Sequence, residues 1–271
     1  MLLGVMGNPI EHSRSPEIHR AFARQVNLDV DYQKILVPPN KFNTTALSFL
    51  DSGSKGFNVT LPHKGDAFLF VHEHSEEALQ SKAVNTVVKL NSGKLKGYNT
   101  DGPGLLADLE KNKSWKIEGK KILVIGAGGA VRGVLVSLVN ARPESVSLFN
   151  RTHKKAEQIV QDFGLEKLSA VRAENLEDTY DIVISGSSAG LLESEISLPS
   201  KIIGPNTLCY DMIYAKNMTA FQRWCLAQKC QAADDGLGML IEQAALAFTL
   251  WTGYEVSTEA VIVNMRDVIN L

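Results

Sequence analysis

The sequence has no excess of charge of one sign, and it has few cysteines. Its 271 residues carry 28 basic and 30 acidic side chains, a formal net charge of −2, so no broad positive field would attract nucleic acid or an anionic membrane. The three cysteines, Cys209, Cys225 and Cys230, have no C-x-x-C spacing, which argues against a disulfide framework and a zinc site. These absences favour small-molecule ligands and a reducing cytoplasm.

Long apolar runs are also missing. The opening residues have no basic flank and stop at the Gly7-Asn8-Pro9 break, so no signal peptide is expected. The most apolar late stretch, residues 239–251, contains Glu242 and Gln243 and is shorter than the roughly 20 residues that cross a bilayer. A hydrophobic content of 44% is enough for a packed core, and this length favours two domains. We expect a cytoplasmic protein without a membrane span.

Strand-like and helix-like segments alternate along most of the chain, which is typical of α/β domains. Strands are predicted at residues 2–6, 32–37, 55–60, 122–125, 145–149, 181–185 and 208–211. Helices are predicted at residues 16–25, 131–139, 154–163, 237–251 and 258–269. The predicted fold is therefore α/β with two domains, an N-terminal one with a mostly parallel sheet and a Rossmann-type one, separated by a cleft. The last two helices are expected to cross back onto the first domain.

A glycine-rich turn follows the strand predicted at residues 122–125. Gly126-Ala127-Gly128-Gly129-Ala130 lies between that strand and a helix, the context of a dinucleotide-binding turn whose free N–H groups hold a pyrophosphate. A tight turn without a ligand is the alternative. Val131 occupies the third position of the pattern, where glycine or alanine is expected, so Gly129, Ala130 and Gly133 are predicted to provide the close packing.

The segment after the next strand indicates which dinucleotide is used. NAD-binding domains carry an acidic side chain there for the ribose 2′-hydroxyl, whereas this chain has Asn150-Arg151-Thr152-His153-Lys154-Lys155. A guanidinium beside a hydroxyl and ammonium groups suits a 2′-phosphate, so NADP is preferred over NAD. Lys154 and Lys155 could instead only solvate the start of a helix.

Polar clusters in the first half of the chain are the candidates for a substrate site. Ser13 and Ser15 could converge on a carboxylate, although Ser15 could equally be a helix N-cap with Pro16 at the first helical position. Asn58 and Thr60 would lie on one face of a strand, shortly before Lys64. The remaining cluster comprises Asn85-Thr86 and Asn99-Thr100-Asp101-Gly102. Taken singly, such residues are more often caps or turns than ligands.

Taken together, the motifs resemble the shikimate dehydrogenase family over essentially the whole chain. In chain order, they are Gly7-Asn8-Pro9 with Ser13-x-Ser15-Pro16, Asn58-Val59-Thr60-x-Pro62-x-Lys64, Ala83-Val84-Asn85-Thr86, Asn99-Thr100-Asp101-Gly102, Gly126 to Ala130, Asn150-Arg151-Thr152, Tyr210-Asp211-Met212-Ile213-Tyr214, and Asp235-Gly236-Leu237-Gly238-Met239 with Gln243-Ala244-Ala245. The resemblance implies a substrate domain of residues 1–101 and 237–271 and an NADP-binding Rossmann domain of residues 102–236.

The resemblance also implies roles for individual residues. Lys64 and Asp101 would form the catalytic pair, in which the Lys64 ammonium can protonate the developing alkoxide and the Asp101 carboxylate can orient that ammonium. The sequence leaves open which of the two transfers the proton. The substrate-binding residues would be Ser13, Ser15, Asn58, Thr60, Lys64, Asn85, Asp101, Tyr214 and Gln243. The cofactor-binding residues would be Glu76, Gly126, Ala127, Gly128, Gly129, Ala130, Asn150, Arg151, Thr152, Lys155, Met212 and Gly236.

The implied activity is the NADPH-dependent reduction of 3-dehydroshikimate to shikimate. Two other interpretations stay open, a quinate/shikimate dehydrogenase with relaxed cofactor use and a non-catalytic NADP-binding regulator of the same fold. No residue set has metal-ligand spacing, so no metal is expected. The sequence leaves open whether the protein is a monomer or a homodimer. It departs from the family pattern at residues 185–190, where Ser185-Gly186 replaces the usual Asn-Ala.

Overall fold

The chain folds into two compact α/β units in the computed structural model, which describes residues 1–176, 179–186 and 198–270. The first unit comprises Met1–Leu105 and Leu240–Met265, and the second comprises Leu106–Met239 and Arg266–Leu271. Each unit contains a six-stranded sheet. The fold class predicted from the sequence is confirmed, whereas the binding roles assigned to the two domains stay predictions.

The first unit begins with strands and helices in alternation. Its elements are β1 (Leu2–Gly7), α1 (Ser15–Gln25), β2 (Asp31–Leu36), α2 (Phe42–Asp51), β3 (Gly56–Val59), α3 (Lys64–Phe70), β4 (Glu73–His74), α4 (Glu76–Ser81), β5 (Thr86–Lys89), β6 (Leu95–Tyr98), α5 (Asp101–Ala107) and most of α9 (Leu237–Thr252). The strands lie in the order β2-β1-β3-β5-β6-β4. Strand β1 pairs in parallel with β2 and β3, whereas β5 is antiparallel to β3 and β6. The sheet is therefore mixed.

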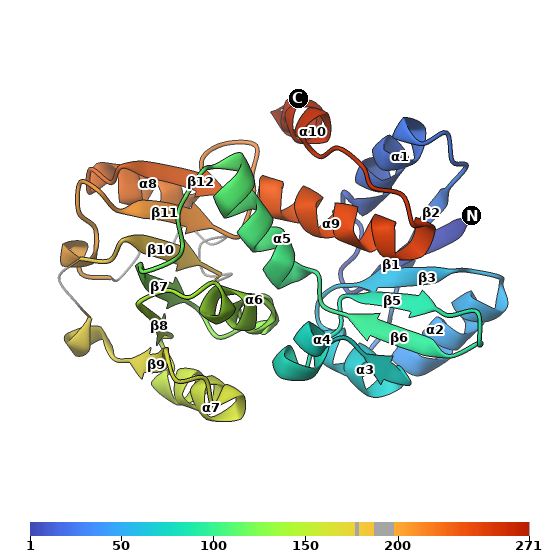
Figure 1. Ribbon diagram of the computed structural model, residues 1–271, viewed down its shortest axis with the longest axis horizontal. Coiled ribbons are helices and arrows are strands. Elements are labelled where there is room, and N and C mark those ends of the chain that lie inside the picture. The colour runs from blue at the N-terminus through green and yellow to red at the C-terminus, as the bar shows by residue number, and fades with distance from the viewer. Residues whose placement is uncertain (177–178, 187–197, 271) are drawn as a thin grey trace. The chain divides into compact units, whose positions relative to one another are not determined.

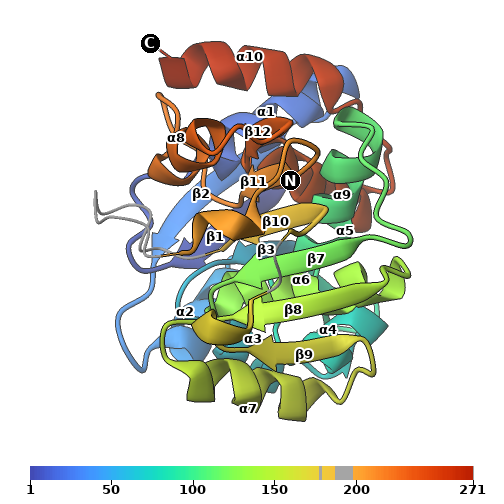
Figure 2. The same ribbon diagram turned by 90° about the vertical axis from the view of Figure 1, so that its left-hand side faces the viewer.

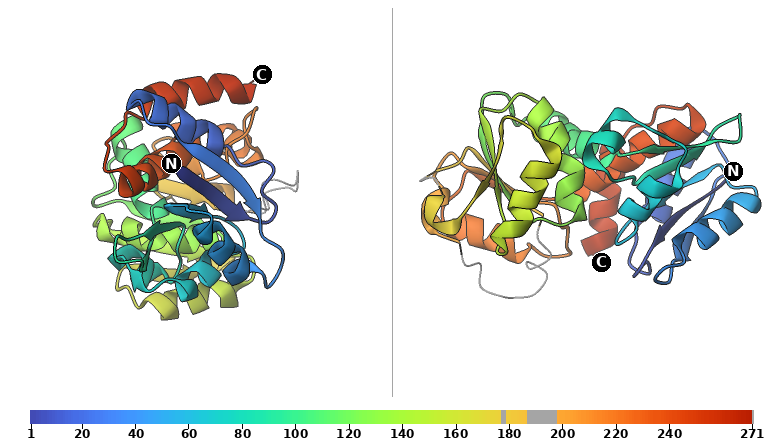
Figure 3. Two further views of the ribbon diagram at one scale, coloured as in Figure 1. Left: turned by 90° about the vertical axis from the view of Figure 1, so that its right-hand side faces the viewer. Right: turned by 90° about the horizontal axis from the view of Figure 1, so that it is seen from below.

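Helices cover both faces of this sheet (Figures 1 and 3). On one face, α2 and α3 pack through an apolar cluster that includes Phe42, Phe49 and Phe57. On the other face, α1 and α9 bring His19 and Trp251 against Tyr32 of β2. The Trp251 indole N–H donates to the carbonyl oxygen of Val87 in β5 at 2.9 Å, which fixes α9 to the middle of the sheet.

The second unit is doubly wound. Its elements are a π-helical turn (Asp108–Asn112), β7 (Lys121–Ile125), α6 (Gly129–Asn140), β8 (Ser145–Phe149), α7 (His153–Phe163), β9 (Leu168–Val171), β10 (Ile182–Ser185), β11 (Leu208–Asp211), α8 (Ala220–Ala227) and β12 (Ala232–Asp235). Figure 2 shows the strand order β12-β11-β10-β7-β8-β9, and all neighbouring strands are parallel. The order reverses between β7 and β10, the position at which such sheets bind a dinucleotide.

The C-terminal segment is helical, as predicted. After β12 the described residues form α9 and α10 (Glu259–Asn270) and no further strand. The unit boundary passes through α10, between Met265 and Arg266. Arg266 is held in the second unit by two bonds to the Asp235 carboxylate, at 2.7 and 2.5 Å. No helix in the described part of the chain is long and apolar enough to cross a membrane.

Candidate active site

Lys64 and Asp101 are each the first residue of a helix. The turn after β3 brings the chain to Lys64 at the start of α3, and the turn after β6 brings it to Asp101 at the start of α5. Lys64 Nζ donates to Asp101 Oδ2 at 2.5 Å, and the two side chains are only 15% and 9% exposed. The structure therefore brings together two residues that are 37 positions apart. A charge-assisted hydrogen bond of this kind is strengthened by exclusion of water.

Asn85 connects this pair to a wider polar network. Its Nδ2 donates to the second Asp101 oxygen at 2.8 Å and to Thr100 Oγ1 at 2.9 Å. Gln243 Oε1, from α9, lies 3.4 Å from the same nitrogen. Both Asp101 oxygens therefore accept a hydrogen bond, one from a neutral amide and one from an ammonium. The carboxylate is held in a single orientation.

Asn58 lies in the same network, in the middle of the first sheet. Its Nδ2 donates to the Asn85 carbonyl oxygen at 3.2 Å and to Thr86 Oγ1 at 2.9 Å. Its Oδ1 accepts from the Tyr32 hydroxyl at 2.6 Å. Thr60, half-buried, continues from the same strand towards Lys64. Sequence reasoning missed Tyr32, because its strand, Asp-Tyr-Gln-Lys-Ile-Leu, has no regular alternation that marks the tyrosine.

Ser13 and Ser15 lie together at the start of α1. Their hydroxyl oxygens are 3.2 Å apart, and Ser15 N–H donates to Ser13 Oγ at 3.3 Å. The N-cap is Arg14, and no side chain caps the helix. Ser15 is therefore the first helical residue and not the cap, so the capping alternative was wrong. The Ser15 hydroxyl accepts its hydrogen bond from Ser13 and caps no backbone N–H group.

The glycine turn of the second unit joins β7 to α6. Gly126 has a φ of +116°, a conformation that favours glycine, and its N–H donates to the Phe149 carbonyl oxygen at 2.8 Å. Gly128 is the N-cap of α6, and a Cβ there would meet nothing within 4 Å. Open space thus adjoins the first-turn N–H groups of a 12-residue helix, where an anion is stabilised. The arrangement fits a pyrophosphate.

A departure from the dinucleotide-binding pattern and one from the family pattern offset each other. Val131, fully buried, occupies the position expected to be glycine or alanine. A Cβ added to Gly186, at the end of β10, would lie 2.4 Å from Val131 Cγ2 and 2.9 Å from Met212 Sδ. Gly186 therefore makes room for the valine. Close packing was predicted from Gly129, Ala130 and Gly133, whereas Gly186 was noted only as a departure from the family pattern and not as a neighbour of Val131. Residues 187–190 of the departing segment lie outside the described residues.

The segment after β8 presents polar groups at the same sheet edge as the glycine turn. Phe149 pairs with Ile125, so Asn150 and Arg151 emerge beside Gly126. Asn150 Nδ2 donates to the Thr152 carbonyl oxygen at 2.9 Å. Thr152 is the N-cap of α7 without a side-chain cap bond, and Arg151, Thr152 and Lys155 are exposed. These side chains could hold a 2′-phosphate.

The remaining predicted site residues, three for the cofactor and Tyr214 for the substrate, are divided between the units. Met212 and Gly236 follow neighbouring strands of the second unit, and a Cβ on Gly236 would lie 2.3 Å from the Met212 carbonyl oxygen. Only glycine fits there. Tyr214 also lies in the second unit, whereas Glu76 lies in the first, exposed and bonded to Gln80. The roles of Tyr214 and Glu76 stay predictions.

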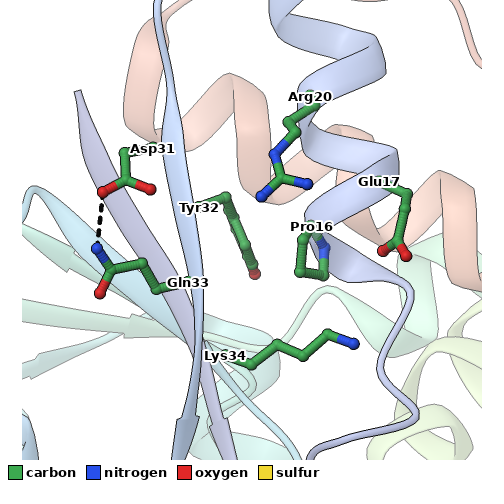
Figure 4. Close-up of a pocket in the computed structure, with 7 residues that line it drawn as sticks. All are labelled: Pro16, Glu17, Arg20, Asp31, Tyr32, Gln33 and Lys34. Carbon is green, nitrogen blue, oxygen red and sulfur yellow. Dashed lines mark hydrogen bonds between the residues drawn. The ribbon is translucent and has the colours of Figure 1, made fainter.

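A surface hollow of about 540 Å³ lies beside α1 and β2 of the first unit (Figure 4). It is lined by Pro16, Glu17, Arg20, Asp31, Tyr32, Gln33 and Lys34. None of these is a predicted site residue, and the charges are mixed. Within the described residues, no group of three or more His, Cys, Asp or Glu side chains could hold a metal ion.

The fold and the polar network define a class of protein. A doubly wound parallel sheet with a glycine turn after its first strand is typical of dinucleotide-dependent dehydrogenases. An ammonium–carboxylate pair among amides and hydroxyls suits a substrate that carries several hydroxyl groups. These features are those of an α/β oxidoreductase that uses a nicotinamide dinucleotide.

Comparisons with known proteins give the family. Three family models match: the shikimate dehydrogenase substrate binding domain at residues 5–87, shikimate / quinate 5-dehydrogenase at residues 108–195, and the shikimate 5′-dehydrogenase C-terminal domain at residues 236–262. The shikimate dehydrogenase (NADP(+)) of Alkalilimnicola ehrlichii is 44% identical over 263 residues, which cover 97% of each chain. The chain therefore belongs to the shikimate dehydrogenase family, and the resemblance inferred from its motifs is confirmed.

Solved structures of similar fold support the same family assignment. The Ael1 enzyme from Pseudomonas putida is 36% identical, with a TM-score of 0.90 over 97% of both chains. Shikimate 5-dehydrogenase from Thermus thermophilus, in complex with NADP(H) and shikimate, is 32% identical, with a TM-score of 0.88 over 98% of this chain and 99% of that one.

Proposed function

We propose that the protein is an NADP(H)-dependent enzyme that catalyses the reversible reduction of 3-dehydroshikimate to shikimate. This reaction belongs to the shikimate pathway, which supplies chorismate for the biosynthesis of aromatic amino acids. The observation that carries the proposal is the bond between Lys64 and Asp101 inside a network of amides and hydroxyls. Relatives that align over 97% and 98% of this chain are named shikimate dehydrogenase (NADP(+)).

The proposed chemistry is a hydride transfer coupled to a proton transfer. The glycine turn would hold NADPH, which when bound would supply the hydride for the ketone carbon of 3-dehydroshikimate. The Lys64 ammonium donates a proton to the ketone oxygen as negative charge develops there. Asp101 holds the ammonium in place and accepts a bond from the adjacent substrate hydroxyl. In the oxidation of shikimate, Lys64 takes the proton back.

Neutral side chains would bind the rest of the substrate. Ser13, Ser15 and Tyr214 would bind its carboxylate. The amides of Asn58, Asn85 and Gln243 and the Thr60 hydroxyl would bind its ring hydroxyls. A site built to hydrogen-bond several hydroxyls rejects analogues that lack them, because its buried polar groups would be left unpaired.

The residues of the second unit would hold the cofactor. The pyrophosphate would lie on the N–H groups of Gly126, Ala127, Gly128, Gly129 and Ala130, and Met212 and Gly236 would line the nicotinamide pocket. Asn150, Arg151, Thr152 and Lys155 would hold the 2′-phosphate, with Glu76 as a further contact. The free space at Gly128 and the exposure of Arg151 support this fit.

Four steady-state assays test the proposal, with shikimate or quinate and with NADP+ or NAD+, followed by the absorbance of the reduced nicotinamide. We expect turnover with shikimate and NADP+ to exceed the other combinations. Comparable turnover with quinate or NAD+ would favour the relaxed quinate/shikimate dehydrogenase. Purified protein that binds NADPH but turns over neither substrate would instead be a regulator of the same fold.

A further inference from the structure

Tyr32 is buried on the inner side of β2, the edge strand of the first sheet. Its side chain is 1% exposed, whereas its neighbours in the strand, Asp31 and Gln33, are exposed. The His19 ring stacks flat on the Tyr32 ring, with centroids 4.4 Å apart and an interplanar angle of 8°. Figure 4 shows the Tyr32 ring between β2 and the first turn of α1, beside Pro16. The ring is therefore held by packing, independently of its hydroxyl.

The Tyr32 hydroxyl begins a chain of hydrogen bonds that leads to the proposed catalytic carboxylate. It donates to Asn58 Oδ1 at 2.6 Å, and Asn58 Nδ2 donates to Thr86 Oγ1 at 2.9 Å. Thr86 Oγ1 donates to Asn85 Oδ1 at 3.0 Å, and Asn85 Nδ2 donates to Asp101 Oδ1 at 2.8 Å. All five side chains are buried. Each bond in such a chain polarises the next.

The orientation of the Asn58 amide depends on these contacts. Its NH₂ group faces the Asn85 carbonyl oxygen, which can only accept, so its oxygen must face the Tyr32 hydroxyl. Within the described residues, the Tyr32 hydroxyl is the side-chain group that donates a hydrogen bond to that oxygen. The Ser15 side chain also interacts with the Tyr32 phenol oxygen and offsets part of the rise that burial causes in its pKa.

We propose that Tyr32 is a positioning residue for substrate recognition, whose hydroxyl holds the Asn58 amide in the geometry that binds shikimate. This inference rests on the proposed function. Tyr32 contacts the binding residues and not the reacting atoms, so its loss should act on substrate affinity more than on the chemical step.

The variant Tyr32→Phe removes the hydroxyl and keeps the packed ring. We expect the KM for shikimate to rise about tenfold, the effect of one lost buried hydrogen bond, with kcat changed less and the KM for NADP+ unchanged. The matched control is Tyr254→Phe, which removes a hydroxyl from an exposed ring of the same unit. An unchanged KM for shikimate in Tyr32→Phe would overturn the proposal.

A double-mutant cycle separates positioning from a general loss of stability. If Tyr32 acts mainly through Asn58, Tyr32→Phe should raise the KM for shikimate much less in an Asn58→Ala background than in the parent protein. Equal fold-changes in both backgrounds would overturn the proposal. The parent protein is the reference for both: if it does not turn over shikimate with NADP+, the proposed function fails first.

Discussion

The predicted site of the first unit and that of the second unit are built differently. In the first unit, side chains bind one another: Lys64, Asp101, Asn85 and Asn58 are buried or nearly so, and each is held by a neighbour. In the second unit, the site consists of backbone around Gly126 and Gly128 and of exposed side chains after β8. The first site is made of side chains that hold one another, whereas the second is made of accessible backbone next to the exposed cations Arg151 and Lys155.

This contrast determines which kinetic constant each substitution should change most. A side chain fixed in a water-excluded network acts mainly on the transition state, because its geometry is set before reaction. An exposed cation contributes to ground-state binding and is screened by solvent. Substitutions in the first unit should therefore change kcat or substrate KM, and substitutions after β8 should change cofactor KM.

The largest effect is expected from Lys64→Ala. If this variant kept its kcat, the contrast between the two sites would be wrong. We predict a fall in kcat of about 10²–10⁴-fold, the range for loss of a general acid, with a modest change in the KM for shikimate. Isothermal titration should give an unchanged dissociation constant for NADP+. A kcat equal to that of the parent protein would remove Lys64 from the mechanism.

An intermediate effect is expected from Arg151→Ala. The KM for NADP+ should rise by about tenfold or more, because charge-assisted bonds to the 2′-phosphate are lost, whereas kinetics with NAD+ should be little affected. Arg142→Ala is the control, since Arg142 is 76% exposed in the same unit and pairs with Glu118. Equal losses with both dinucleotides would contradict the assignment of Arg151.

The smallest effect concerns stability in acid. Burial lowers the pKa of His19 from 6.5 to about 3, against a weaker opposing effect of the nearby Asn58 side chain, which does not meet hydrogen-bond geometry with either ring nitrogen. The unfolded chain then binds a proton that the folded chain does not. The contribution of neutral His19 to the free energy of unfolding is therefore complete above about pH 6.5. It decreases as the pH falls towards 3, by about 2 kcal/mol at pH 5.

His19→Leu should remove this part of the acid sensitivity. Urea unfolding at pH 5 and pH 7.5, followed by tryptophan fluorescence, would measure it, with the exposed His12→Gln as the control. If His19→Leu and the parent protein lose the same free energy of unfolding between these pH values, His19 is not the group that titrates.

Sequence patterns predicted the buried strands well and the polar ones poorly. Strands β8 and β11 have the predicted bounds because each is a short apolar run next to a turn. Strand β12 has the sequence Ala-Ala-Asp-Asp, and β6 contains Lys96 and Gly97. Neither shows apolar alternation, so neither was predicted. Their pairing with neighbouring strands, a tertiary effect, determines them.

Some parts of the candidate site could likewise be predicted from local sequence patterns, and others could not. The glycine turn could be predicted because its residues are contiguous and lie between a strand and a helix. The contacts of Asn85 with Thr100 and Gln243 span 15 and 158 positions, so only the family resemblance suggested that they share a site. Neither Tyr32 nor the pairing of Gly186 with Val131 belongs to a local pattern, and both required coordinates.

The central claim is that Lys64 and Asp101 act as one catalytic unit, and a second cycle of variants tests it most directly. The measurement is kcat with shikimate and NADP+ for Lys64→Ala, Asp101→Asn and the double variant. Residues that act as a unit are strongly non-additive, so the double variant should be about as slow as the slower single variant. Losses that multiply in the double variant, or a single variant with unchanged kcat, would contradict the account.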